Sequence, residues 1–171
     1  VYFTNNEKKI TQIKKGEVID QNFQKEENNK IKNLKYEVKL NQEKQYIITA
    51  DFSEISYEGA GELVKMQKVK ALFVDEDNLP IIITSDTAIY NNANHNTNFR
   101  KNVQITYIDN IVFADKVDLN FQNNMIKVFE NVRYDGQQAQ MKTDNIKINL
   151  ITKKIDIYMN DNKKNVKLNT K

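Results

Sequence analysis

The sequence predicts an all-β protein, and three observations lead to that prediction. Apolar and polar residues alternate along most of the chain from residue 34 onward, for example over residues 34–40 and 146–150, as in strands with one buried face. Asparagine-rich turns separate these runs, and a helical period is hard to find. A short motif recurs at a near-fixed distance. We therefore expect an antiparallel sheet built from a repeated unit.

The recurring motif is a small residue followed by an aspartate and then by alternating apolar residues. Its four copies are spaced by 35, 29 and 29 residues and contain Asp51, Asp86, Asp115 and Asp144. A valine follows each aspartate after 17 to 22 residues, and these valines are Val69, Val103, Val132 and Val166. About four copies of a two-strand unit bury their apolar faces by stacking on one another. We predict a β-jelly roll, a twisted antiparallel β-sandwich with open edges.

The elements follow in order from a polar beginning. Residues 1–33 are rich in Lys, Asn, Gln and Glu, which predicts an N-terminal arm or juxtamembrane tether. The predicted β domain covers residues 34–171 and opens with a hairpin that turns at 41–44. Gly59 and Gly61 predict a bulge or a sharp corner, and the single proline, Pro80, predicts the start of a strand. Later hairpins are expected to turn near residues 91–96, 123–124 and 152–154.

The repeated aspartates have the same parity as the apolar residues after them. A row of unpaired carboxylates on a buried face is costly. We therefore expect either a bulge that turns each aspartate outward or a corner where its oxygens accept backbone N–H groups. A catalytic carboxylate pair is the alternative, but it explains neither the four copies nor their spacing.

Other catalytic chemistry has few candidate residues. There is no cysteine, and the single histidine, His95, lies in an Asn-rich turn, where we expect it to be solvated. A zinc site or a nucleophile-histidine-acid triad therefore has too few candidate residues. The sequence predicts no enzyme, no catalytic residue, no cofactor and no metal.

The charge and hydropathy of the sequence indicate which partners to expect. The net charge is +3, with basic and acidic residues interspersed, which argues against nucleic acid as a partner. No run of about 18 apolar residues is present. The chain begins Val1-Tyr2-Phe3 without an initiator methionine, as expected if an upstream apolar segment precedes it.

The repeats carry a resemblance to a known family. Ala50-Asp51, Ser85-Asp86, Ala114-Asp115 and Thr143-Asp144, each with its following strand, turn and returning valine, resemble the repeat of the OstA-like β-jelly-roll proteins of lipopolysaccharide export. Residues 143–152 are the most specific part, and the resemblance covers roughly residues 34–168. Within the family, the chain is most similar to the periplasmic member that an N-terminal helix, absent from this chain, anchors in the inner membrane.

The resemblance implies a non-enzymatic lipid conduit in the periplasm. Its implied partners are lipopolysaccharide, an inner-membrane ABC transporter complex, and a periplasmic jelly-roll bridge protein that pairs with an edge strand. The expected lipid-binding residues on the interior face are Ile55, Tyr57, Tyr90, Phe99, Val103, Ile105, Tyr107, Phe113, Val117, Leu119, Phe121, Ile126, Val128, Val132, Ile146 and Ile148. The expected partner edge consists of Ile155, Ile157, Met159, Val166 and Leu168. Two alternatives remain: a soluble bridging protein of the same system, and a structural β-repeat without a ligand.

Overall fold

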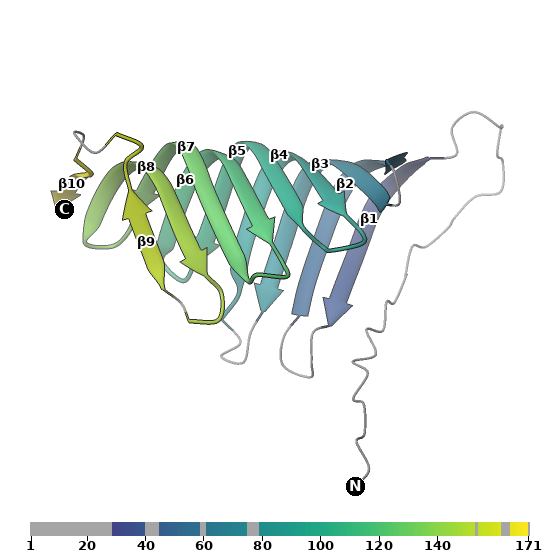
Figure 1. Ribbon diagram of the computed structural model, residues 1–171, viewed down its shortest axis with the longest axis horizontal. Helices are drawn as coiled ribbons and strands as arrows, with labels where there is room; N and C mark the ends of the chain where they lie inside the picture. Colours follow the sequence, from purple (N-terminus) through teal and green to yellow (C-terminus); the bar gives the residue numbers. More distant parts are fainter. Residues whose placement is uncertain are drawn as a thin grey trace, which may run out of the picture.

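The computed structural model describes residues 29–39, 45–58, 61–74, 79–152, 154–161 and 165–170. This part of the chain consists of strands joined by turns (Figure 1). The strands are β1 (Lys30–Lys39), β2 (Gln45–Glu58), β3 (Gly61–Val74), β4 (Ile81–Asn91), β5 (Thr97–Tyr107), β6 (Asn110–Asn120), β7 (Met125–Asp135), β8 (Ala139–Asn149), β9 (Ile155–Tyr158) and β10 (Lys167–Thr170). Most of the predicted arm and the predicted turn at 41–44 lie outside the described residues.

All ten strands form one antiparallel sheet, in which neighbours in sequence are neighbours in space from β1 to β8. The sheet is open rather than closed into a barrel, consistent with a β-jelly roll, so the predicted fold class is confirmed. β1 begins at Lys30, four residues before the predicted start at Leu34. Gly61 opens β3 at a hairpin between two long strands.

The last two strands are two halves of one edge strand. β9 pairs with Asn145–Ile148, in the second half of β8, and β10 pairs with Ala139–Lys142, in its first half. Asp144 lies between these two halves, and its Oδ2 accepts a hydrogen bond from the backbone N–H of Asn160, at 2.9 Å. Asn160, just after β9, therefore lies beside the middle of β8.

A line of irregular residues crosses the middle of the sheet. The repeated aspartates belong to β2, β4, β6 and β8, and residues with positive φ lie near them in β1, β3, β5 and β7. In β5 and β7 the irregularity is a β-bulge: Lys101 and Asn102 oppose Asp115, and Glu130 and Asn131 oppose Asp144. A bulge bends its strand and increases the local twist. The repeat of the sequence is thus a repeated bend.

At two of the bends, the aspartate of the motif accepts a side-chain hydrogen bond. Asp86 Oδ2 accepts a hydrogen bond from Asn102 Nδ2 at 2.7 Å, and Asp115 accepts one from the side chain of Asn131. Asparagine tolerates the left-handed backbone better than most residues, and its amide reaches the carboxylate of the preceding strand. The valine after each bulge returns to the core. Asp86, Asp115 and Asp144 lie at register shifts, so the bulge hypothesis is confirmed for these three, whereas Asp51 is exposed without a register shift.

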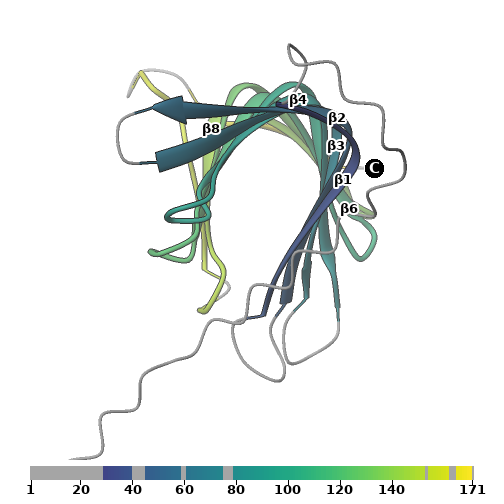
Figure 2. The same ribbon diagram turned by 90° about the vertical axis from the view of Figure 1, so that its right-hand side faces the viewer.

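The bends fold the single sheet into two walls. Figure 2 shows the strands curving around a common interior, so that the sheet is U-shaped in this view. The first wall, called here the Tyr46 wall, has the buried apolar residues Leu34, Val38, Tyr46, Ile48, Ala50, Val69, Ala71, Phe73, Ile81, Ile83, Val103, Ile105, Ala114 and Val132. The second, the Tyr90 wall, has Val64, Met66, Ala88, Tyr90, Phe99, Val117, Leu119, Ile126, Val128, Ile146 and Leu150.

The two walls face each other with an offset along the strand order. Tyr36 of β1 stacks on Tyr90 of β4, with ring centroids 5.1 Å apart. Tyr46 of β2 hydrogen-bonds to Thr97 of β5, with 2.9 Å between Oη and Oγ1. In both contacts, the half of a strand that belongs to the Tyr46 wall meets the Tyr90-wall half of the strand three positions later in the strand order. The twist of the sheet accounts for such an offset, and it gives the two ends of the interior different surroundings.

Candidate functional site

The interior between the walls is the candidate site, because it gathers the apolar side chains of both walls along the whole strand order. On the Tyr90 wall, strand pairing places Tyr90, Thr97, Leu119, Ile126 and Ile148 in one row that ends at Ile155 of β9. Side chains opposite each other on antiparallel strands share a face and contact one another. The row therefore forms a continuous track from β4 to β9, apolar beyond Thr97.

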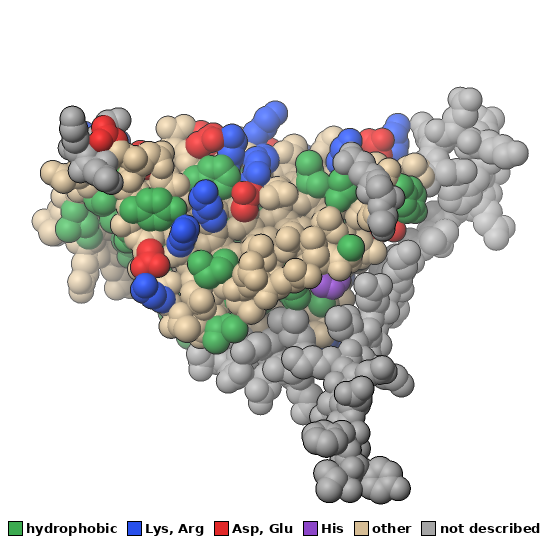
Figure 3. Space-filling view, in the orientation of Figure 1, with side chains coloured by type: hydrophobic (Ala, Val, Ile, Leu, Met, Phe, Trp, Pro, Cys, Tyr) green, Lys and Arg blue, Asp and Glu red, His purple; other side chains and the backbone are tan. Residues whose placement is uncertain are grey.

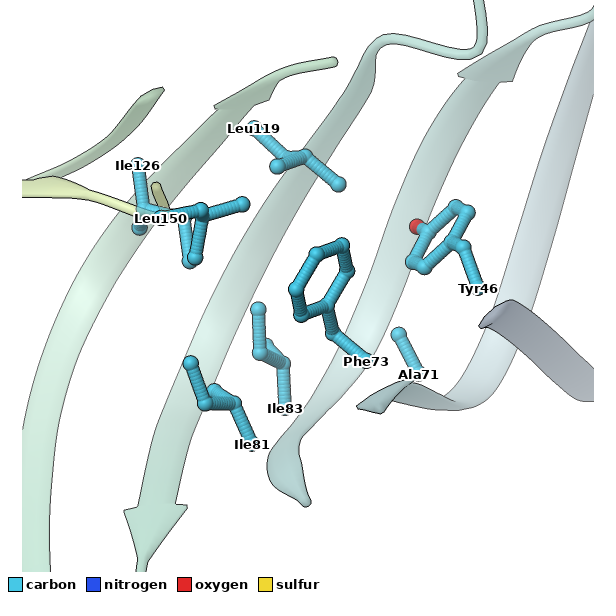
Figure 4. A pocket seen from close by; sticks show the side chains of 8 residues that line it. All are labelled: Tyr46, Ala71, Phe73, Ile81, Ile83, Leu119, Ile126 and Leu150. Atoms are coloured by element: carbon cyan, nitrogen blue, oxygen red, sulfur yellow. The ribbon is translucent and has the colours of Figure 1, made fainter. Parts of the chain in front are cut away.

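The two walls are closely packed where Tyr46 and Phe73 face Leu119 and Ile126. A cavity of about 10 Å³ lies between them, which is space for about one water molecule. Figure 4 shows its lining: Leu119, Ile126 and Leu150 belong to the Tyr90 wall, and Tyr46, Ala71, Phe73, Ile81 and Ile83 belong to the Tyr46 wall. An acyl chain therefore enters this part of the interior only if the walls separate.

Most of the predicted interior set lies inside. Ten of these residues are buried: Tyr90, Phe99, Val103, Ile105, Val117, Leu119, Ile126, Val128, Val132 and Ile146. Four others are partly buried and pack against the core: Ile55, Tyr107, Phe121 and Ile148. Whether any of them binds lipid stays a prediction.

Two residues of the predicted interior set lie elsewhere. Tyr57 is 71% exposed near the end of β2, which with β3 is longer than the other strands and extends beyond them (Figure 2). Phe113 lies beneath the guanidinium of Arg133, 4.5 Å from its ring centroid, and points away from the face of Ala114. The irregularity after Phe113 reverses the alternation, so its shared parity with Val117 and Leu119 was misleading. The interior placement of Tyr57 and Phe113 was wrong.

Sequence reasoning also missed interior residues. Tyr46, Phe73 and Ile81 line the cavity but were not in the predicted set. Their neighbours Ile47, Leu72, Val74 and Ile82 are apolar as well, so alternation alone did not mark them as inward-facing.

His95 was expected to be solvated, and this prediction was also wrong. It is only 8% exposed, and its Nδ1 lies 2.6 Å from the Tyr90 hydroxyl oxygen. Its ring contacts Phe121 edge to face, with centroids 5.3 Å apart. The turn folds the side chain inward because His95 has a positive φ of 60° and its N–H donates to the Asn91 carbonyl. No periodicity marks an inward side chain in a turn.

Burial changes the acid-base properties of this cluster. Desolvation lowers the pKa of His95, because the charged imidazolium loses its water shell. Desolvation, and then the nearby Glu62 carboxylate, raise the pKa of Tyr36 to about 12. Desolvation likewise raises the pKa of Tyr46 and of Tyr90. The cluster is therefore a set of neutral hydroxyl and imidazole groups beside one carboxylate.

The partner edge predicted from the sequence is formed by β9, β10 and the chain beside them. Within the described residues, no strand pairs with the outer side of β9 or β10. Ile155, Ile157 and Leu168 lie opposite the inward-facing Ile148, Ile146 and Met141, yet they are 57%, 41% and 63% exposed. Met159 and Val166 are half-buried. The apolar interior thus ends in an exposed apolar edge.

The outer face has a different character. The ring of Phe129 lies within 6 Å of cationic groups of Arg100, Lys116 and Lys127, at 5.7, 5.9 and 5.1 Å. Arg100 and Lys116 also form ion pairs with Asp118 and Glu130. Basic and acidic side chains are interspersed on the face seen in Figure 3. The outer face therefore offers little of the one-signed potential that binds nucleic acid.

Two further findings concern metals and membranes. The described residues contain no group of three or more His, Cys, Asp or Glu side chains placed to hold a metal ion. Across the same residues, no helix has the length and hydropathy that crossing a bilayer requires.

Comparison of the chain with protein-family models and with curated proteins found no match. The resemblance to the lipopolysaccharide-export family therefore rests on the repeats, and the function is argued from the structure.

Proposed function

We propose that this chain binds lipopolysaccharide and transfers it across the periplasm, as a component resembling LptC. In this proposal it receives lipid from an inner-membrane ABC transporter complex and passes it through the interior to the next jelly-roll protein. The observation that carries the proposal is the apolar interior that follows the strand order and ends at an exposed edge with Ile155, Ile157 and Leu168.

The energetics of such an interior suit reversible binding. Each buried methylene contributes about 0.8 kcal/mol, so about ten methylenes contribute roughly 8 kcal/mol. Association and side-chain ordering cost a free energy of the same order and so offset this gain. Where the facing side chains are apolar, an acyl chain replaces one apolar contact by another. The balance favours a protein that loads lipid and also releases it.

The exposed edge supports the second half of the proposal. β9 and β10 present backbone N–H and C=O groups without a strand partner in the described residues, and such an edge accepts a strand from another protein. Pairing there would also cover Ile155, Ile157 and Leu168. Two joined jelly rolls would then share one continuous apolar interior.

A structural β-repeat without a ligand is the second candidate function. The observation that favours it is the tight packing between the walls, with a cavity of about 10 Å³. In this alternative the walls stay closed, and the interior serves as an ordinary hydrophobic core.

Site-specific photo-crosslinking distinguishes the two candidates. A photoreactive residue replaces Leu119, which is buried on the Tyr90 wall, and in a second variant Lys127, which is exposed on the neighbouring strand. Incubation with purified lipopolysaccharide is expected to crosslink the lipid at position 119 and not at position 127. A folded protein that crosslinks at neither position contradicts the conduit and supports the structural repeat.

A further inference from the structure

The tyrosine hydroxyls and the buried histidine of the interior gather near the β1 end, whereas the buried Thr143 and Asn145 of β8 bond to Tyr158 and Asn160 beside the edge. Two side-chain hydrogen bonds join the walls near the β1 end: Tyr36 Oη donates to Glu62 Oε1 at 3.2 Å, and Tyr46 Oη lies 2.9 Å from Thr97 Oγ1. Tyr90 and His95 form a third bond beside them. We call Tyr36, Tyr46, Glu62, Tyr90, His95 and Thr97 the polar cluster.

The interior toward β9 is lined differently. Beyond Thr97, the row on the Tyr90 wall continues with Leu119, Ile126, Ile148 and Ile155. The Tyr46-wall residues that share the cavity with this row are apolar except for the hydroxyl of Tyr46, which belongs to the polar cluster. Beyond Tyr46, wall separation exchanges apolar contacts for the apolar contacts of a ligand.

Wall separation at the polar cluster has a different requirement. Buried hydroxyl, imidazole and carboxylate groups are costly to leave without partners. The walls can part here only if the incoming molecule supplies donors and acceptors of its own. Apolar chains cannot do this, so the part of a ligand that fits the cluster is its polar head.

The composition of the cluster restricts the chemistry of that head. The tyrosine and threonine hydroxyls donate and accept hydrogen bonds, and neutral His95 does both through its two ring nitrogens. The Glu62 carboxylate only accepts and repels anions. Hydroxyl and amide N–H groups satisfy all of these side chains, whereas a phosphate beside Glu62 does not.

Building on the proposed function, we infer a direction for the bound amphiphile. We propose that its hydroxyl- or amide-bearing head lies at the polar cluster and that its acyl chains extend along the interior toward β9. The interior thus has a polar end and an apolar end, and the acyl chains lie nearest the exposed edge.

Nuclear magnetic resonance of isoleucine methyl groups tests this direction, because isoleucines occur along the whole interior. Ile55 lies two strands from Tyr90, about 10 Å away at the usual strand spacing. Ile155 lies five strands away, about 24 Å. The ligand probe is a long-chain N-acyl amino sugar with a nitroxide either on the last carbon of the acyl chain or on the sugar.

The two probes are expected to erase different signals in the full chain. The chain-end nitroxide should remove the methyl signals of Ile148 and Ile155 and leave that of Ile55. The sugar nitroxide should remove the signal of Ile55 and leave that of Ile155. Reversed losses, or equal losses at both ends, overturn the proposed direction while leaving lipid binding intact. No loss with either probe contradicts the proposed function itself.

A matched pair of variants tests whether the polar cluster sets the direction. The double variant Tyr90→Phe/Thr97→Val removes two adjacent hydroxyls with little change in shape, and each probe should then erase signals at both ends. Tyr107→Phe removes a tyrosine hydroxyl outside the cluster and should leave the pattern unchanged. A direction that persists in the double variant overturns the role of the cluster.

Discussion

The two ends of the sheet are both edges, but only one of them is closed. β1 is an edge strand whose Leu34 and Val38 are buried in the core. At the other end, Ile155 and Leu168 face the same interior and remain mostly exposed. A strand with a hydrogen-bonded neighbour on one side only can therefore still have its apolar side chains covered by the core.

The offset between the walls explains the difference. β1 belongs mainly to the Tyr46 wall, and β4 faces it from the Tyr90 wall, as the stack of Tyr36 on Tyr90 shows. β10 belongs to the Tyr46 wall. By the same offset, the Tyr90-wall strand that would face it lies three positions beyond the last strand of the sheet. Leu168 accordingly has no opposing wall within the described chain. At the opposite end, Tyr57 of the Tyr90 wall is left exposed for the same reason.

The largest expected effect comes from making the same isoleucine-to-alanine substitution near each end of the sheet. Ile48→Ala removes a fully buried side chain near β1 and is expected to lower the free energy of unfolding by about 2–5 kcal/mol. Ile155→Ala removes a side chain that is 57% exposed and should change it by about 0.5 kcal/mol or less. Urea unfolding of both variants provides the measurement. Equal losses would mean that the β9 end is closed in solution.

A smaller effect is expected at the polar cluster. Tyr90→Phe removes the hydroxyl that lies 2.6 Å from His95 Nδ1 and leaves a buried nitrogen without its partner. This change should cost about 1–3 kcal/mol. Tyr107→Phe serves as the control and should cost less, since Tyr107 is only partly buried. The two variants are compared by thermal or urea unfolding, and an equal loss would show that the hydrogen bond adds no stability to the closed end.

Much of this fold could be predicted from the sequence, because alternation and repetition are local patterns. The alternating apolar and polar residues around Leu119 and Ile146 correctly predicted strands with one buried face. The repeated aspartates correctly gave a recurrent irregularity, although the sequence left a bulge and a corner as alternatives. Both features depend on a few consecutive residues.

The misplaced residues depend on contacts that the local pattern does not record. The register of β6 shifts between Phe113 and Lys116, and the buried Ala114 and Val117 are three positions apart across this shift, which is why Phe113 was placed on the wrong face. The exposure of Tyr57 follows from the offset between walls, a property of the whole sheet. His95 is buried by contacts with Tyr90, across its own turn, and with Phe121, which follows β6.

The hydrogen bonds at the bends are expected to have a still smaller effect, and they lie at different distances from the open edge. Asp86→Ala removes the acceptor of the Asn102 amide in the middle of the sheet and should cost about 0.5–1.5 kcal/mol. Asp144→Ala removes the acceptor of the Asn160 N–H beside the open edge. We expect hydrogen exchange to increase in β9 and β10 for Asp144→Ala but not for Asp86→Ala. Unchanged exchange in the Asp144 variant would contradict its role in holding the edge strand.

The smallest predicted effect is a pH dependence that arises at the closed end. Burial lowers the pKa of His95, whereas the same imidazole in the unfolded chain takes up a proton near pH 6.5. Between these two values the unfolded state binds more protons, so the free energy of unfolding falls as the pH is lowered through about 6.5. The contribution of His95 is complete above this pH and is progressively lost below it.

His95→Gln keeps a polar side chain that does not titrate, so its unfolding free energy should change less between pH 7.5 and 5.5 than that of the native chain. The interval stops at pH 5.5 because carboxylates begin to titrate below it. Urea unfolding at a series of pH values measures the difference between the two proteins. Parallel pH profiles would mean that His95 has the same pKa in the folded and unfolded states, and thus that water reaches its ring. Because Tyr90 and Phe121 are the groups in contact with that ring, such a result would indicate that the polar end opens as readily as the β9 end.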